Sequence, residues 1–266
     1  MTMPGNATER LRVATYNIHK CKGLDGRTRP ERIARVLAEL RADVVALQEV
    51  LSVADGDAQK DQAKYLAAAL EPKYHYWLGE NRKIRGAAYG NAVLSRFPIV
   101  HMHNYDVTRS RRERRGCMRV DLDLGGGRRL HVFNVHLGTG FFERRLQGDL
   151  LVSREILIDP ELRAPRIVLG DFNEWTRGLA TRVLSEHFDE VEFAKPRGVW
   201  AKVGVAAKPS RKTYRKTYPG VLPLLPLDHI YFERGLRLLG SSVHRSRVAL
   251  VASDHLPLVA DLELPG

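Results

Sequence analysis

The stretch Ile167-Val168-Leu169-Gly170-Asp171-Phe172-Asn173 decides how the rest of the chain is interpreted. Its three β-prone apolar residues predict a buried strand, and Gly170 permits an unusual backbone turn. Asp171 and Asn173 are two positions apart, so on an extended backbone they face the same side. A carboxylate and a carboxamide aimed together suit activation of water beside phosphate. Asp and Asn are also common turn residues, so this stretch alone leaves a turn and a catalytic site as alternatives.

Length and composition favour a packed globular protein. The chain has 266 residues, of which 44% are apolar, enough for a sizeable core. No apolar run approaches the ~18 to 20 residues of a transmembrane helix. Residues 1–10 are polar and lack the apolar region of a signal peptide, so we expect a cytoplasmic protein. We expect Cys21 and Cys117, far apart in sequence, to be free thiols rather than parts of a disulfide framework or a zinc site.

The charge is the strongest compositional signal. A formal net charge of +12 and a pI near 9.9 favour encounters with nucleic acid, anionic lipid or phosphorylated small molecules, without choosing among them. Residues 109–115 contain five arginines, and residues 208–216 are basic with an interleaved tyrosine. Arginine pairs bidentately with phosphate and tyrosine stacks on bases, so both stretches predict nucleic-acid contacts; a solvated loop is the alternative. The substrate contacts we expect in the first stretch are Arg111, Arg112, Arg114 and Arg115.

Strand and helix patterns alternate along both halves of the chain, which predicts an α/β protein. Strands are expected at 11–19, 43–49, 74–78, 88–95, 99–107, 117–124, 129–137, 167–169, 227–232, 237–251 and 258–262. Helices are expected at 30–40, 63–70, 143–158 and 176–187.

Polar residues stand at six of the expected strand ends or edges. They are Asn17, Glu49, His136, Asp171 with Asn173, Asp228, and Asp254 with His255. Each alone fits a turn, a cap or a hydrogen-bonded core histidine. Together they require compensation, because carboxylates at the edge of a core are costly unless charges or metals pair with them. Asn17, Glu49 and Asp254 offer hard oxygen ligands, so we expect Mg²⁺ or Mn²⁺. The exception to the absence of a paired-histidine cluster for zinc is His101 with His103, which lies on an expected strand without nearby acids and which we interpret as structural.

The order of these motifs resembles that of the endonuclease/exonuclease/phosphatase superfamily, in particular its deoxyribonuclease and sphingomyelinase-like metal-dependent phosphoesterases. The matching motifs are Thr15 to His19, Leu47 to Glu49, Tyr89 to Ser95, Asn134 to Leu137, Gly170 to Asn173, Leu227 to Ile230 and Ser253 to Pro257. The resemblance implies a four-layer sandwich of two packed mixed β-sheets flanked by helices. Because motifs from both halves share one site, we expect one domain over residues 11–264 after a tail at 1–10.

The resemblance also implies roles for the metal and the attacking water. Glu49 would be the principal metal ligand, with Asn17 and Asp254 completing or adjusting the metal shell. Asp171 would orient or deprotonate the water, and Asn173 would hold a phosphate oxygen.

The remaining roles concern the phosphoryl group and the leaving oxygen. His255 would stabilise charge on the phosphoryl group, and Asp228 would fix the tautomer and protonation of His255. His136 resembles the histidine that serves the leaving oxygen. Asn91 would support the substrate side of the site.

These observations predict a Mg²⁺- or Mn²⁺-dependent phosphodiester hydrolase, a nuclease acting on DNA or RNA by in-line attack of an activated water. One alternative is a phosphatase or phosphodiesterase for a phospholipid or a small phosphorylated metabolite. We expect no stable membrane insertion, since no amphipathic anchor helix accompanies the arginines. A further alternative is a polyanion-binding protein that has lost catalysis.

Overall fold

The computed structural model describes residues 9–53, 60–109, 112–174, 178–191 and 216–265. Arg111 and most of the basic stretch at 208–216 therefore lie outside the described residues.

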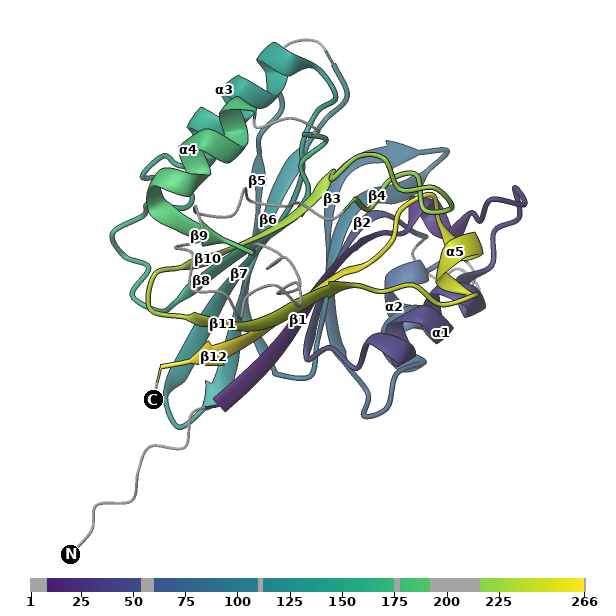
Figure 1. Ribbon diagram of the computed structural model, residues 1–266, viewed down its shortest axis with the longest axis horizontal. Helices are drawn as coiled ribbons and strands as arrows, with labels where there is room; N and C mark the ends of the chain where they lie inside the picture. The colour runs from purple at the N-terminus through teal and green to yellow at the C-terminus, as the bar shows by residue number, and fades with distance from the viewer. Residues whose placement is uncertain (1–8, 54–59, 110–111, 175–177, 192–215, 266) are drawn as a thin grey trace, which may run out of the picture.

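The strands form two six-stranded mixed sheets (Figure 1). The first has the order β11-β12-β1-β2-β4-β3, and the second has the order β5-β6-β7-β8-β10-β9. Each sheet contains one parallel pair at its centre, β1 with β2 and β7 with β8, and its other pairs are antiparallel. The bounds in the first sheet are β1 Glu9–Asn17, β2 Val44–Ser52, β3 His75–Ile84, β4 Ala87–Ser95, β11 Arg237–Val243 and β12 Leu258–Leu264. Those in the second are β5 Ile99–Asp106, β6 Gly116–Gly125, β7 Arg128–His136, β8 Arg166–Asp171, β9 Phe188–Glu190 and β10 Asp228–Glu233.

Helices cover the outer faces of both sheets, which makes four layers (Figure 1). Beside the first sheet lie α1 Pro30–Leu40, α2 Gln62–Ala68 and the short α5 Ala249–Ala252. Beside the second lie α3 Phe141–Leu151 and α4 Leu179–His187. The expected α/β four-layer sandwich is confirmed.

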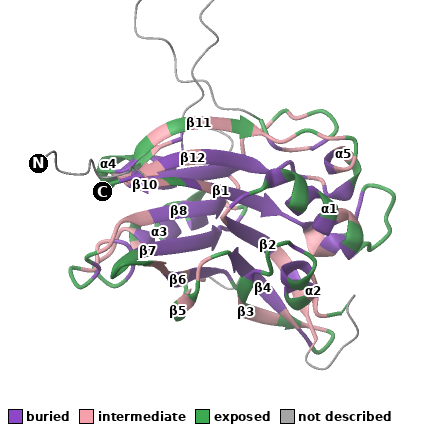
Figure 2. Ribbon diagram, turned by 90° about the horizontal axis from the view of Figure 1, so that it is seen from below, coloured by how far each residue is buried: buried purple, intermediate pink, exposed green. Residues whose placement is uncertain are grey.

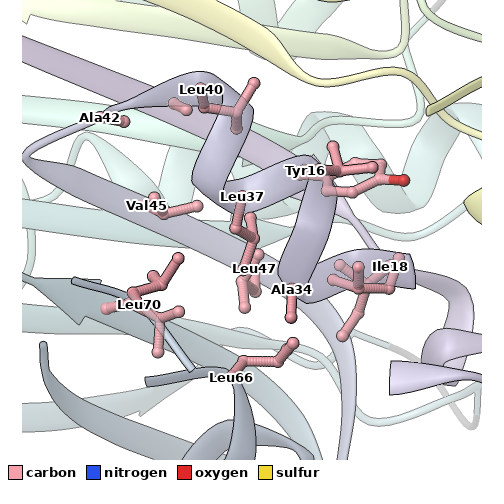
Figure 3. Close-up of a cluster of buried hydrophobic side chains, with 14 of the residues drawn as sticks. Tyr16, Ile18, Ala34, Leu37, Leu40, Ala42, Val45, Leu47, Leu66 and Leu70 are labelled. Carbon is pink, nitrogen blue, oxygen red and sulfur yellow. The ribbon is translucent and has the colours of Figure 1, made fainter. Parts of the chain in front are cut away.

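The core consists of three apolar clusters, one at each interface between layers. In β2, Val44 and Ala46 pack between the sheets, whereas Val45 and Leu47 pack against the helices. Figure 3 shows Leu37 of α1 in the cluster that contains Val45 and Leu47. A strand covered on both faces reads as a continuous apolar run, which explains its sequence. Figure 2 shows the central strands buried and the outer edges exposed.

Several expected boundaries differ from the structure. β1 begins at Glu9, so its first two residues extend into the expected tail. The helix expected at 143–158 occupies Phe141–Leu151. The strand expected at 237–251 ends at Val243, and the prediction is wrong beyond it, because the Ser246 hydroxyl accepts a hydrogen bond from the Ala249 amide at the start of α5 (3.1 Å). No helix within the described ranges is long and apolar enough to cross a membrane.

Candidate active site

Strand register in the second sheet brings three of the expected site residues into one row. His136 at the end of β7 is the register partner of Asp171 on β8, and Asp171 is the partner of Asp228 on β10. Gly170 makes this pairing feasible. Its φ is +153°, and a Cβ added there would lie 2.0 Å from the carbonyl oxygen of Val135. A side chain at position 170 would therefore force β7 and β8 apart.

The first sheet contributes Asn17 and Glu49. Asn17 ends β1, whereas Glu49 lies within β2 at a bulge, where the register against β4 shifts between Leu47 and Val50. Glu49 has a left-handed φ of +56°, and such bulges re-aim side chains next to active sites. The Asn17 amide donates to Glu49 Oε1 (3.3 Å) and to Asp171 Oδ2 (3.0 Å). Asn17 thus links carboxylates from the two sheets.

Asp171 lies at the centre of the site and is 1% exposed. Its Oδ2 is 3.7 Å from Nε2 of both His136 and His255. Its Oδ1 accepts a hydrogen bond from the backbone amide of Asn173 (2.9 Å). Asn173 has a left-handed φ of +49° and donates its side-chain amide to the Leu137 carbonyl (2.9 Å). The turn after β8 is therefore fixed by the same two residues that the sequence singles out.

His255 is held by Asp228, whose Oδ2 lies 2.9 Å from His255 Nδ1. Burial alone would lower the pKa of His255, but the negative charges of Asp228 and Asp171 outweigh burial and raise the pKa to about 10. The imidazole is therefore protonated at neutral pH. Asp228 Oδ1 is buried without a hydrogen-bond partner among the described residues. Asp171, Asp228 and His255 each place one potential metal-ligand atom within 4.8 Å of the others.

His136 has the opposite charge state. Burial and the positive charge of Arg115 lower its pKa to about 4, so the ring is neutral at pH 7. Arg115 Nη1 lies 3.2 Å from both ring nitrogens, and its Nη2 is 3.2 Å from Glu113. The Arg115 side chain, expected to contact substrate, is 8% exposed and packs against His136. Two histidines with pKa values moved apart thus flank one carboxylate, an arrangement suited to acid and base roles.

Two side chains that the sequence analysis did not single out as site residues, those of Lys20 and His19, face Glu49 and Asp254. His19, Lys20 and Cys21 have consecutive left-handed φ values of 45°, 58° and 56°. This strained turn directs the Lys20 ammonium onto Glu49 Oε2 and places His19 Nδ1 3.7 Å from Asp254 Oδ1. Burial alone would raise the pKa of Glu49, but three neighbours lower it to about 2. They are His136, which carries charge only in the acid range where Glu49 itself titrates, the Lys20 ammonium, and the Asn17 amide. Glu49 is therefore ionised. No residue type in this stretch predicts a left-handed turn. The only feature of the sequence that could have pointed to Lys20 and His19 as site residues is the polarity of the segment after Asn17.

Asn91 lies behind the site and is fully buried. Its amide donates to the carbonyls of Gly116 (3.1 Å) and Asn134 (3.3 Å). Asn134 in turn donates to the Leu47 carbonyl (2.9 Å) and accepts from Gln48 (2.7 Å). This buried network joins the two sheets beneath Glu49 and His136.

The exposed rim beside His136 combines arginine with apolar side chains. Arg112 is 60% exposed, and its Nη1 is 4.0 Å from Glu143 Oε2 in the first turn of α3. Arg114 is also exposed. On the same helix, Phe141, Phe142 and Leu146 are 52%, 75% and 51% exposed. Large apolar residues on this scale of exposure are typical of binding surfaces.

A family model described as Endonuclease/Exonuclease/phosphatase family matches residues 14–255. The chain belongs to this family. The resemblance drawn from the seven motifs is thereby confirmed.

Several known proteins are similar to nearly the whole chain. Escherichia coli K12 has a relative named "Uncharacterized protein YbhP" that is 32% identical over 272 residues, covering 96% of each chain. The crystal structure of an endonuclease/exonuclease/phosphatase from Beutenbergia cavernae is 25% identical, with a TM-score of 0.71 over 97% of this chain and 72% of that one. The mannosyl-6-phosphatase Bt3783 of Bacteroides thetaiotaomicron shares the fold at 20% identity, with a TM-score of 0.69 over 95% of this chain and 99% of that one.

Proposed function

We propose that the protein is a Mg²⁺- or Mn²⁺-dependent phosphodiester hydrolase that cleaves DNA or RNA. The observation that carries this proposal is the buried Asp171 carboxylate, set between a neutral His136 and a cationic His255 and joined to Glu49 through Asn17. Phosphoester hydrolysis needs a positioned water, neutralisation of the nonbridging oxygens and help for the leaving oxygen. This arrangement offers a group for each need.

The residues present fit a divalent cation. The Glu49 carboxylate faces the Lys20 ammonium, Asp254 Oδ1 faces His19 Nδ1, and the buried Asp228 Oδ1 has no hydrogen-bond partner among the described residues. Two groups of residues could hold the ion: Glu49 with Asn17 and Asp254, or Asp171 with Asp228 and His255. Glu49 is 19% exposed, whereas the side chains of Asp171, Asp228 and His255 are at most 6% exposed. Mg²⁺ retains several waters, so the more open carboxylate suits it better. We therefore assign the ion to Glu49, with Asn17 and Asp254, where it would neutralise phosphate charge.

The chain's own residues divide the remaining work. Asp171 accepts the proton of the attacking water, with its carboxylate oriented by the Asn17 amide and the Asn173 backbone. The cationic His255, fixed through Asp228, stabilises the developing negative charge on phosphorus-bound oxygens. His136 lies on the other side of Asp171 and serves the leaving oxygen. Asn173 donates to a phosphate oxygen when substrate displaces its bond to Leu137.

The rim favours a nucleic-acid substrate. Arg112 and Arg114 offer exposed guanidinium groups to backbone phosphates. The rings of Phe141 and Phe142 pack edge to face with centroids 5.4 Å apart, and both rings retain exposed surface on which bases can stack. Charge and aromatic rings side by side are the combination that single-stranded nucleic acid requires.

The same apolar side chains favour a second candidate, a phosphodiesterase for phospholipids, because Phe142 and Leu146 could enter a bilayer surface. The two candidates separate in a hydrolysis panel of single-stranded DNA, RNA, anionic phospholipid vesicles and sugar phosphates, each in Mg²⁺ and in Mn²⁺ with an EDTA control. The nuclease proposal predicts metal-dependent cleavage of DNA or RNA that weakens steeply with salt. Cleavage of vesicles or sugar phosphates alone would replace it.

A paired variant locates the substrate surface. Phe142→Ala should raise KM for single-stranded nucleic acid by about 5- to 150-fold, for one lost stacking contact of about 1 to 3 kcal/mol, and should lower kcat less. Val100→Ala on β5 is the matched control, since Val100 is 46% exposed and lies on another element. Equal kinetics in the two variants would remove Phe142 from the substrate surface.

A further inference from the structure

A cavity of about 550 Å³ opens at the opposite end of the second sheet from Asp171. It is bordered by the β6–β7 hairpin, the segment before β8 and the end of β12. Its residue His131 precedes His136 by five positions on β7, a separation of about 17 Å at ~3.3 Å per residue. Figure 1 shows the start of β1 and the C-terminal end of the chain near this end of the sandwich. The cavity is therefore separate from the candidate active site.

A buried ionic group forms part of the cavity wall. Asp121 accepts hydrogen bonds from Nε and Nη2 of Arg119 (2.8 and 2.6 Å), and its Oδ1 lies 2.7 Å from His131 Nδ1. All three side chains are at most 12% exposed. Burial alone would raise the pKa of Asp121, but hydrogen bonds from His131 and Arg119 lower it to about 2. Buried ionic groups add little net stability compared with apolar packing. In this group, Asp121 holds Arg119 and His131 in place, and their contacts compensate the charge of Asp121, the only buried acid among the residues that line the cavity.

The lining of the cavity carries a net positive charge, with the exposed Glu161 as its second acid beside Asp121. Arg128 is paired with Glu9 (2.6 Å), but Arg129 and Arg163 are exposed and have no ion pair with any described residue. The lining contains four arginines and one histidine against two acids. Arg129 and Arg163 come from segments more than thirty residues apart that the fold brings to one opening. Both exposed guanidinium groups therefore add positive charge to the same cavity.

The rest of the lining is apolar, with Leu124, Pro165 and Leu264 among its residues. A cavity of this volume lies within the usual range for small-ligand sites, which combine apolar walls with a few placed polar groups. We propose that this cavity binds a small organic phosphate of about mononucleotide size, with its phosphate between Arg129 and Arg163 and its organic part against the apolar wall. This site does not depend on the proposed hydrolytic function.

The test is calorimetric titration of the full chain with adenosine 5′-monophosphate in EDTA, with adenosine and inorganic phosphate as comparison ligands. We expect saturable binding of the nucleotide and much weaker binding of both comparison ligands. Arg129→Ala combined with Arg163→Ala should weaken nucleotide binding by about tenfold or more, through loss of charge-assisted hydrogen bonds. Arg245→Ala combined with Arg247→Ala is the charge-matched control, since both arginines are exposed on the connection between β11 and α5.

Several results would overturn the proposal. The nucleotide could fail to bind, or it could bind equally to wild type and to the Arg129 and Arg163 double variant. Inorganic phosphate binding as tightly as the nucleotide would remove the role of the apolar wall. Binding lost in His136→Ala but kept in the double variant would place the nucleotide in the candidate active site instead. Circular dichroism of each variant checks that the fold is retained.

Discussion

Lys20 should lower the affinity of the protein for divalent metal, and Lys20→Met should raise it. The Lys20 ammonium is hydrogen-bonded to Glu49 Oε2, so an ion that binds this oxygen must first displace it. Methionine keeps most of the side-chain length and removes only the charge and the donor. The ring centroid of Tyr89 lies 5.7 Å from the Lys20 ammonium, so this ring can pack against the methionine side chain.

The size of the effect follows from burial. The side chains of Lys20 and Glu49 are 31% and 19% exposed, between a surface pair worth up to ~1 kcal/mol and a buried pair whose rupture costs about 3 to 5 kcal/mol. We expect about 1 to 2 kcal/mol, which corresponds to roughly 5- to 30-fold tighter metal binding. Without metal, the variant should be less stable by a similar amount, because Glu49 then lacks its cation.

The assay is a titration with Mn²⁺ in which free ion is followed by electron paramagnetic resonance. Lys22→Met is the matched control, because Lys22 is exposed, forms no ion pair with a described residue and carries the same charge. The control should bind Mn²⁺ almost as wild type does, since an exposed charge is screened by salt. Unchanged or weaker Mn²⁺ binding in Lys20→Met would refute the idea that Lys20 holds the metal position.

Other substitutions test the fold and the rim. Gly170→Ala should lower the free energy of unfolding, measured in urea, by about 2 to 4 kcal/mol, because the added Cβ clashes with the backbone of β7. Gly240 has open space around it, so Gly240→Ala should change the free energy of unfolding by less than about 1 kcal/mol. Similar losses in the two variants would contradict the steric argument. Asp121→Asn should lower the free energy of unfolding by about 2 kcal/mol at neutral pH, because a carboxyl with a lowered pKa stabilises the fold above about pH 4. This difference from wild type should shrink as the pH falls toward 2. A difference that stays constant with pH would argue against this role of the Asp121 charge. Charge reversal at Arg112 and Arg114 should raise KM for DNA or RNA more than it lowers kcat, and an unchanged KM would leave both as solvated side chains.

The strand ends that carry the candidate site could be predicted from local sequence, but their juxtaposition could not. Alternation and apolar runs place Asp171 and His136 at strand ends. The row formed by His136, Asp171 and Asp228 depends on the register of three strands that are far apart in sequence, and no local pattern encodes that register. From the sequence, the proximity of these residues could be inferred only through the resemblance of the motif order to that of a family.

Positions within strands and loops were harder to predict for physical reasons. Glu49 was expected at the end of a strand, but β2 continues to Ser52 and Glu49 leaves the ladder at a bulge. Arg115 and Arg112 look alike in an arginine-rich run, yet one is buried against His136 and the other is exposed. Lys20 owes its role to a left-handed turn of non-glycine residues, which residue propensities disfavour.

The most direct test of the account compares wild type with Asp171→Asn in metal-dependent hydrolysis of single-stranded DNA and RNA, with Mn²⁺ binding measured on both proteins. Asp189→Asn, an exposed aspartate on β9, is the control. We predict that wild type and Asp189→Asn cleave at least one substrate in Mg²⁺ or Mn²⁺ but not in EDTA. Asp171→Asn should lose about 10²- to 10⁴-fold in kcat while binding Mn²⁺ and remaining folded. Wild-type turnover by Asp171→Asn would contradict the assignment of Asp171 as the base, and absence of metal-dependent cleavage in wild type would contradict the proposed nuclease.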